Sequence, residues 1–387
     1  MRPSKEALTL KEAEGIPAEG TPEAQRTRAS QRQLVWWAFK KHRPALISAW
    51  FLAGMLIVIA LCEFVAPFGD RHRDSEYTTA PPQVLKLWDT DGPDGFQFGL
   101  HVDGYTSTQD PRSLRITYEA NPEDRVEVGF FVKGEEYELF GLIPMDRHLV
   151  GPKDVEDPMY LLGTTTDGQD LLSQLVYATR VSASVGIIGV LLAFALGIVL
   201  GAISGYFGGW IDNGVQRIIE LIMAVPSIPL WLGLAAALPT DMGPVARYFI
   251  ITTILALVAW TGLAREVRGR FLALRNEEFV TSALLDGSSH SRVMFRHMLP
   301  SFSSHVIAAL SLSIPGMILA ETALSWLGMG LRPPAVSWGV QLQDASKWSV
   351  LSGAPWLLIP GLCVVLVVLA FNFVGDGMRD AADPYKH

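Results

Sequence analysis

The sequence predicts an all-α polytopic membrane protein with six transmembrane helices and a small β-containing extracytoplasmic insertion. Of the 387 residues, 49% are hydrophobic and 18% are charged, whereas soluble domains are about 25% charged. The apolar residues also gather in long runs, and a helix needs about 20 of them to cross a hydrocarbon core of ~30 Å. Six runs meet this requirement, at 45–65, 181–206, 215–238, 245–264, 306–327 and 355–374.

The chain before the first run, residues 1–44, is expected to be a cytoplasmic tail. Residues 1–30 are rich in Glu, Ala, Thr and Pro, a composition typical of disorder. Residues 31–43 mix aromatic and cationic side chains, which suits an interfacial helix on the inner leaflet or an inward continuation of the first span. Because a long polar segment precedes it, the first span, within 45–68, is predicted to be an uncleaved signal anchor.

The Lys and Arg residues in the short flanks of the spans predict the orientation of the chain. Fourteen lie in residues 26–43 of the N-terminal tail, in the loop between the fourth and fifth runs and in the C-terminal tail. The short loops of opposite parity hold three, Arg247, Arg332 and Lys347. Both termini and the segment 265–300 are therefore expected in the cytoplasm.

Residues 69–160 are expected to form the extracytoplasmic insertion, ahead of a core of five transmembrane helices over 161–387. Its strand-like stretches are 96–102, 114–118 and 126–132, and Lys133-Gly134-Glu135 predicts a turn before a return strand at 137–143. The insertion holds nineteen acidic and nine basic residues, a net charge of −10. This charge fits either a solvated face or a surface that receives a partner protein.

The segment 265–300 is the most informative part of the chain. Residues 276–285 predict a short amphipathic helix with acidic residues, Glu278 among them, in the first turn, where the helix dipole favours them. Gly287 is placed to end this helix in left-handed geometry. A second, basic helix over 289–299 stops at Pro300, which opens the fifth span. Two short helices joined by a glycine make a knob that can sit in a groove of a cytosolic partner and transmit its motion.

This arrangement resembles the EAA loop of binding-protein-dependent ABC importer permeases. The pattern of that loop is Glu-Ala-Ala, three residues, Gly, nine residues, Ile, one residue and Leu-Pro. Thr281-Ser282-Ala283, Gly287, His297 and Leu299-Pro300 stand at those spacings, and they differ from the pattern at its first two positions and at its Ile position. Further stretches are similar to the C-type subunit of dipeptide/oligopeptide permeases, namely 162–173, 205–212, 320–328, 332–339 and 369–380. Together they extend the resemblance over residues 160–385.

The resemblance implies a six-helix fold of the ABC importer permease type and a transmembrane permease subunit of an ATP-driven importer. The solute would be a peptide or, alternatively, an oligosaccharide or a nickel complex. The implied partners are a homologous B-type permease subunit, two ATP-binding subunits, an extracytoplasmic solute-binding protein and membrane lipid, in a bacterial or archaeal cytoplasmic (inner) membrane. The residues implied to couple this chain to the ATPase are Glu278, Thr281, Ser282, Ala283, Gly287, Leu299 and Pro300.

The same resemblance implies that the chain is not an enzyme and holds no cofactor, since ATP and Mg²⁺ would be bound by the ATPase subunits. In agreement, the sequence contains no G-x-x-x-x-G-K-[ST] motif, so a phosphate-binding loop is missing. The eight histidines are scattered and predict neither a catalytic nor a metal site, and the acidic net charge of −8 argues against nucleic-acid binding. Cys62 and Cys363 lie in apolar runs and are predicted to be small buried side chains.

The spans carry two further patterns. Small residues recur every four positions along the second span and predict close packing, either within this subunit or against the sister permease; they are Gly189, Ala193, Gly197, Gly201 and Gly205. Helix-breaking residues, Pro226 and Pro229 in the third span and Pro315-Gly316 in the fifth, place these two spans nearest a water-filled translocation path.

Glu321 is an ionisable group in the apolar fifth span, so it is predicted to be a functional-site residue on this path or, alternatively, a paired structural carboxylate with Arg332 as its partner. An ion-driven carrier or channel is a second possible function. It requires ionisable residues deep in several spans, and Glu321 alone comes close to this description.

Overall fold

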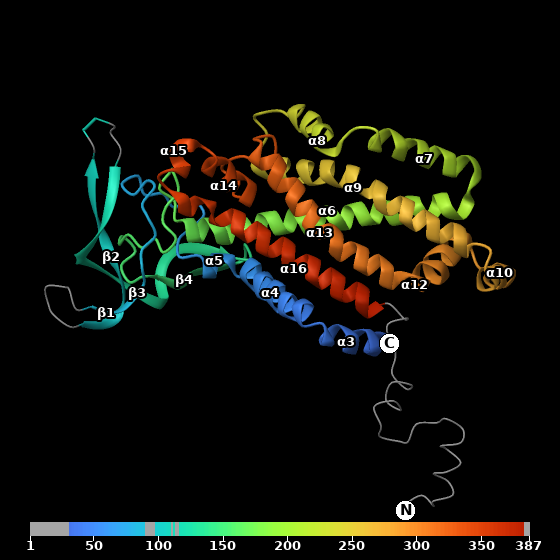
Figure 1. Cartoon of the computed structure of the whole chain (residues 1–387), viewed down its shortest axis with the longest axis horizontal. Coiled ribbons are helices and arrows are strands. Elements are labelled where there is room, and N and C mark those ends of the chain that lie inside the picture. Colours follow the sequence, from blue (N-terminus) through green and yellow to red (C-terminus); the bar gives the residue numbers. More distant parts are fainter. Residues whose placement is uncertain (1–30, 90–96, 110, 113–115, 383–387) are drawn as a thin grey trace, which may run out of the picture.

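Five helices are long and apolar enough to cross a membrane within the part of the chain that the structure describes. The structure is a computed structural model that describes residues 31–89, 97–109, 111–112 and 116–382, so the predicted disordered segment 1–30 lies outside the described residues. The five helices are α4 (Arg43–Ala60), α6 (Leu171–Phe207), α9 (Pro244–Leu274), α13 (Ser303–Trp326) and α16 (Ile359–Ala382). They lie side by side in one elongated bundle (Figure 1).

The predicted third span is a broken one. It consists of α7 (Gly209–Met223) and α8 (Ser227–Ala236), which meet at an angle of 84°. Pro226 stands at the break with an extended ψ of 136°, and it has no N–H to continue the hydrogen-bond ladder of α7. The prediction of six spans therefore agrees with the structure if this bent pair is counted as one span.

Helices α6 and α9 each extend ten residues beyond one end of the apolar run that predicts them. Helix α6 begins ten residues earlier than expected, at Leu171, where the Asp170 carboxylate caps it by accepting the Ser173 N–H at 2.7 Å. Helix α9 continues to Leu274, so residues 265–274 are helical and the prediction of a loop there is wrong. The reason is amphipathicity, because Val267 and Phe271 are buried while Arg265, Glu266 and Arg270 are exposed.

Shorter helices frame the bundle. The predicted interfacial stretch is α3 (Gln31–Lys41), a helix that is separate from α4 because the chain breaks at His42, whose Nδ1 caps α4 by accepting the Ala45 N–H. Beyond α4 lies α5 (Cys62–Val65). The others are α10 (Glu278–Leu285), α11 (His290–Arg292), η1 (Val293–Met298), α12 (Leu299–Ser301), α14 (Trp338–Ala345), α15 (Trp348–Leu351) and η2 (Pro355–Leu358).

The insertion forms a four-stranded antiparallel sheet in the order β1-β2-β3-β4. Its strands are β1 (Lys86–Asp89), β2 (Gln97–Gln109), β3 (Ile116–Leu139) and β4 (Ile143–Pro152). The sheet lies at one end of the bundle and α10 at the opposite end (Figure 1). These two ends are called the sheet end and the knob end below.

The predicted turn at Lys133-Gly134-Glu135 is wrong. Strand β3 runs through these residues with a register irregularity between Lys133 and Tyr137, and the chain reverses at Phe140-Gly141-Leu142 instead. Gly134 sits inside the ladder because the His148 ring fills the place of its missing side chain, so close that a Cβ there would overlap the ring. A glycine that admits a neighbouring ring and a glycine in a turn look alike in the sequence.

Buried contacts attach the sheet to the bundle. Phe68, Val126 and Tyr160 belong to a small apolar core of the insertion. The Glu135 carboxylate on β3 accepts the Gly69 N–H at 3.0 Å and lies 2.7 Å from His72 Nδ1. Hydrogen bonding to His72 lowers the pKa of Glu135 and raises the pKa of His72. The insertion is therefore joined to the segment that follows the first span by charge-assisted bonds as well as by packing.

Candidate functional site

The knob end is built on α10, which ends in a Schellman motif. The Gly287 N–H donates to the Leu284 carbonyl and the Ser288 N–H donates to the Ala283 carbonyl, both at 3.0 Å. Gly287 has a φ of +79°, the left-handed value that the sequence predicts, and a Cβ built there would meet no atom within 4 Å. Glycine is therefore needed at this position for its backbone conformation and not for space.

One face of α10 is buried against the bundle and the opposite face is open. Val280 and Ala283 are buried and belong to the main apolar core, together with Met294 of η1. Leu285 is 84% exposed, and Phe279 and Leu284 are also exposed. Of the predicted coupling residues, Glu278, Thr281, Ser282 and Pro300 are exposed, Leu299 is half-buried, and Ala283 supports the knob from below. An apolar surface held on a fixed, capped helix is suited to docking a partner.

Polar contacts hold α6, α7 and α9 together near the knob, and one of them joins α6 to the knob itself. Arg268 of α9 donates two hydrogen bonds of 2.6 Å to the Asp212 carboxylate of α7, which Ser204 of α6 also contacts. The Tyr206 hydroxyl of α6 and His290 Nδ1 of α11 lie 2.7 Å apart. Sequence reasoning places Asp212 in a family-like stretch and does not pair it with Arg268, because the two residues are far apart in the sequence.

The stripe of small residues on α6 lies against α9 and α13 of the same chain. A Cβ at Gly201 would stand 2.5 Å from the Ala264 carbonyl oxygen, and a Cβ at Gly205 would stand 2.6 Å from that of Arg268. At Gly197 the nearest atoms belong to Leu263 and Trp260 of α9, and at Gly189 they belong to Met317 of α13. Ala193 is buried in the same core. The stripe thus lets two helices approach α6 closely.

A cavity of about 400 Å³ opens between α6, α8, α9 and α13. Its walls are mostly apolar and include Phe194, Trp231, Leu263, Gly316 and Met317. The indole Nε1–H of Trp231 is buried and has no hydrogen-bond partner among the described residues. The sequence gives no signal for Trp231, because an indole in an apolar run is typical of a lipid-facing or core side chain.

Of the predicted helix-breaking residues, Gly316 lines this cavity and the three prolines do not. Pro226 and Pro229 are exposed, at and just after the break that turns α8 toward the cavity wall. Pro315 is buried inside α13, where it cannot donate to the carbonyl one turn earlier, and Gly316 beside it lines the cavity. The third and fifth spans, which the proline pattern singles out, therefore both contribute to the cavity.

Glu321 is fully buried and held by hydroxyl groups. Ser325 Oγ donates to one carboxylate oxygen at 2.8 Å and Ser182 Oγ of α6 donates to the other at 3.1 Å. Ser182 in turn accepts the Trp338 N–H at the start of α14. The suggested partner Arg332 lies elsewhere, since its Nε donates to the Gly328 carbonyl. Glu321 does not line the cavity and joins α6, α13 and α14 at the sheet end.

A second buried ionisable group, Arg247, fixes the sheet end of α9. Arg247 donates from Nε to the Gly330 carbonyl at 2.6 Å and from Nη2 to the Met329 carbonyl at 3.1 Å. These carbonyls belong to the turn that follows α13, so the bonds fasten α9 to α13. The sequence assigns Arg247 to a short external loop, whereas the structure buries it in the first turn of α9.

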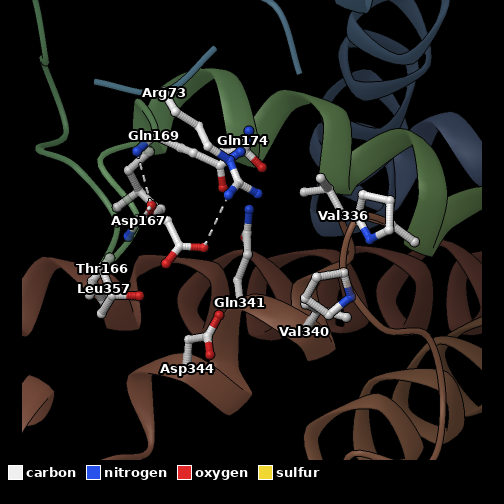
Figure 2. Close-up of a pocket in the computed structure, with 15 residues that line it drawn as sticks. Arg73, Thr166, Asp167, Gln169, Gln174, Val336, Val340, Gln341, Asp344 and Leu357 are labelled. Carbon is white, nitrogen blue, oxygen red and sulfur yellow. Dashed lines mark hydrogen bonds and ion pairs between the residues drawn. The ribbon is translucent and has the colours of Figure 1, made fainter. Parts of the chain in front are cut away.

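A polar pocket opens at the sheet end, between the start of α6, the loop before it and α14. Figure 2 shows the Gln341 side chain of α14 reaching toward Arg73, whose guanidinium lies 3.9 Å from the Asp167 carboxylate. Neither amide atom of Gln341 has a hydrogen-bond partner among the described residues. No group of three or more His, Cys, Asp or Glu residues suited to a metal ion occurs in the described part of the chain.

Two family models match this chain. The family model of the binding-protein-dependent transport system inner membrane component matches residues 197–386, and that of the N-terminal transmembrane domain of oligopeptide transport permease C matches residues 30–82. Neither family model covers 83–196, which holds all four strands of the insertion.

Curated relatives are more than a third identical to this chain over the segments that match. The oligopeptide transport system permease protein OppC of Haemophilus influenzae is 37% identical over 62% of this chain and 75% of its own length. The dipeptide transport system permease protein DppC of Alkalihalophilus pseudofirmus is 38% identical over 57% of this chain and 71% of its own. Among solved structures, an inward-facing MetNI methionine ABC transporter chain is 16% identical over 54% of this chain and 96% of its own, with a TM-score of 0.43. On the strength of the sequence relatives, this chain belongs to the family of binding-protein-dependent transport system inner membrane components and is a permease subunit of the oligopeptide and dipeptide permease C type.

Proposed function

We propose that this chain is the C-type permease of an ATP-driven peptide importer in the cytoplasmic membrane, with both termini in the cytoplasm. It pairs with a homologous B-type permease, with two ATPase subunits that bind ATP and Mg²⁺, and with an extracytoplasmic solute-binding protein. The peptide substrate is supported by the names of the relatives, which are oligopeptide and dipeptide permeases. In this orientation the knob end faces the cytoplasm and the sheet end faces the binding protein.

The observation that carries the proposal is the construction of the knob. Helix α10 is buried through Val280 and Ala283 and presents Leu285 almost fully exposed, at the far end of the bundle from the sheet. Such a helix fits a groove on an ATPase subunit, where closure of the ATPase pair on ATP would push it. The coupling residues Glu278, Thr281, Ser282, Gly287, Leu299 and Pro300 surround that contact, with Ala283 beneath it.

The motion would reach the cavity through α9. This helix runs unbroken from the residues beside the knob to the cavity wall at Leu263, and Arg268 ties it to α7. Because α7 and α8 make up the broken span, a shift of α9 would move α8 relative to α13 and change the opening of the cavity. This is a two-state change in which solute from the binding protein enters from one side and leaves on the other.

The coupling role is tested with two variants of Gly287 in the assembled transporter. Gly287→Asn tolerates a left-handed backbone and should retain most transport. Gly287→Trp adds backbone strain and a bulky side chain on the open face, and it should leave the complex assembled with ATP hydrolysis uncoupled from transport. Solute uptake and ATP hydrolysis are measured together in proteoliposomes. Uptake at the wild-type level by Gly287→Trp would refute the coupling role.

Docking of the ATPase is tested separately at Leu285. Because its side chain is 84% exposed, Leu285→Asp should leave the fold of α10 intact while it removes apolar contact area from the proposed interface. Fewer ATPase subunits should then co-purify with the permease. Co-purification at the wild-type ratio would show that the exposed face of α10 is not the docking surface.

The solute class is tested on the cognate binding protein. Peptides of two to five residues, oligosaccharides and nickel complexes are compared for their ability to protect that protein against thermal unfolding, since a ligand stabilises the folded state that binds it. Protection by peptides is expected. Protection by a sugar or a nickel complex alone would assign the same permease architecture to that solute.

A further inference from the structure

The β3–β4 hairpin ends in an exposed apolar tip. Residues 139–145 contain no charged side chain, and the turn itself is Phe140-Gly141-Leu142. Leu142 is 83% exposed, Phe140 60% and Ile143 52%. Three large apolar side chains on one solvent-facing turn form a patch that soluble surfaces rarely carry without a partner.

The backbone of this turn shows that the aromatic ring is not there to form the turn. Phe140 has a φ of +57° and Gly141 a φ of +66°, so both central residues adopt the left-handed conformation. These two residues are the centre of the β-turn from Leu139 to Leu142, inside a loop of three residues. Asn and Gly tolerate the left-handed conformation, whereas an aromatic residue in it is strained. A strained residue with an exposed apolar side chain points to a contact that the ring makes outside the chain.

The hairpin lies against the end of the first span. The Phe131 ring of β3 packs on the Phe64 ring of α5, with the ring centroids 5.9 Å apart. His148 Nδ1 of β4 donates to the Ala66 carbonyl at 2.6 Å. Strand β4 accordingly lies beside α5 in Figure 1, whereas β1 lies farther from the helices. The middle of the hairpin is therefore fixed beside α5, and the tip projects beyond these contacts from Leu139 and Ile143.

The apolar surface of the first span continues toward the tip. Trp50 and Ile57 of α4 are 73% and 60% exposed, as expected for side chains that face acyl chains in a helix of the bundle periphery. Phe64 and Phe131 extend this surface past α5 onto the hairpin. Phe and Leu side chains are typical of apolar faces that are buried at the boundary between headgroups and acyl chains.

We propose that the β3–β4 tip, formed by Phe140, Leu142 and Ile143, inserts into the bilayer leaflet at the sheet end and anchors the insertion to lipid. The occupant of the patch is the membrane itself and not a second protein. The tip holds the sheet at a fixed distance from the membrane surface, beside α5. Neither matching family model covers the strands, so this contact lies outside both of them. This inference requires only that the chain spans a membrane and does not depend on the solute or on the ATPase.

The test is spin-label accessibility in the complete transporter, reconstituted in lipid nanodiscs. Single cysteines are introduced by Leu142→Cys, Ile57→Cys and Phe98→Cys after Cys62→Ala and Cys363→Ala, and each is labelled with a nitroxide. Ile57 is the lipid-facing reference. Phe98 is a matched control, because it is 78% exposed and lies on β2, opposite Trp88 of β1 and outside the β3–β4 hairpin. Collisions of each label with oxygen, which concentrates in lipid, and with a water-soluble nickel chelate are measured.

The Leu142 label is expected to behave like the Ile57 label, with oxygen collisions dominating and nickel collisions several-fold lower than at Phe98. Nickel accessibility at Leu142 equal to that at Phe98 would overturn the proposal, since the tip would then be in water. Protection from both reagents would also overturn it, because a protein surface would then cover the tip. A second variant, Phe140→Asn, suits the turn better and removes the ring, so a rise in nickel accessibility at Leu142 in that background would assign the anchoring to the ring.

Discussion

The contact between α6 and α9 leads to a prediction that the structure makes quantitative. At Gly201 a Cβ would stand 2.5 Å from the Ala264 carbonyl oxygen and 3.0 Å from the Val267 Cβ. Ordinary contacts between such atoms are 3.4–4 Å, so Gly201→Ala requires the two backbones to separate by on the order of 1 Å in a close-packed interior. Overpacking of this kind costs typically about 1–3 kcal/mol.

Gly262 of α9 provides the matched control. It also lies inside a spanning helix, but it lines the cavity and a Cβ there would meet no atom within 4 Å. Gly262→Ala gains the same helix propensity without a clash, so it should be neutral or slightly stabilising.

Both variants are compared with the parent by SDS titration of the purified chain in mixed micelles. Gly201→Ala should unfold at clearly lower SDS than Gly262→Ala, by an amount equivalent to about 1–3 kcal/mol. Equal midpoints for the two alanine variants would refute the reasoning, because the helices would then have room to separate without loss.

Three further predictions follow from the polar groups. Trp231→Phe removes the indole N–H, which has no partner among the described residues, and should raise the solute concentration for half-maximal transport by about two- to tenfold with unchanged stability. An unchanged half-maximal concentration would mean that this N–H donates to water and not to the solute. Glu321→Ala orphans two buried hydroxyls and should destabilise the chain by about 1–3 kcal/mol in the same titration, whereas Glu321→Gln should be milder. The ion pair of His72 and Glu135 should stabilise the fold most between pH 4.5 and 6.5, the ordinary pKa values of a glutamate and a histidine. This contribution should fall as the pH rises through the elevated pKa of His72 or drops through the lowered pKa of Glu135. Thermal stability measured at pH 5.5 and 8.5 tests this, and His72→Gln should reduce the difference between the two values.

Hydropathy predicts the helices of this protein well because lipid imposes one requirement on every span. Four of the six apolar runs correspond to single helices, and the first corresponds to α4 with α5 beyond it. The observed helix ends differ from the ends of the runs where a cap or an amphipathic stretch extends the helix. Asp170 extends α6 outward as its N-cap, and Phe271 keeps α9 helical past the apolar run. A window of hydropathy detects neither effect, since both depend on one or two side chains.

The sheet and the polar contacts are harder to predict because they depend on pairs that are distant in sequence. Gly134 resembles a turn residue until His148 is seen to fill its space, and the true turn at Phe140 carries an aromatic residue where propensity favours Asn. Arg268 likewise has no visible partner until the fold brings Asp212 beside it. The knob could be predicted because its spacing is local, with Gly287 closing a helix of eight residues.

The fastening of α9 by Arg247 gives that helix the properties of a lever. Its 31 residues correspond to a length of ~46 Å at 1.5 Å per residue, and the two bonds from Arg247 fix one end to the turn after α13. The cavity wall lies part-way along α9, and the knob follows its other end, where Arg268 binds Asp212 of α7. A tilt of a few degrees about the fixed end therefore displaces the knob by several ångströms and the cavity wall by less. The position of Arg247 along α9 therefore sets how far the cavity wall moves for a given movement of the knob. Moving this fixed point to another turn of α9 would change that ratio without any change in the residues of the cavity.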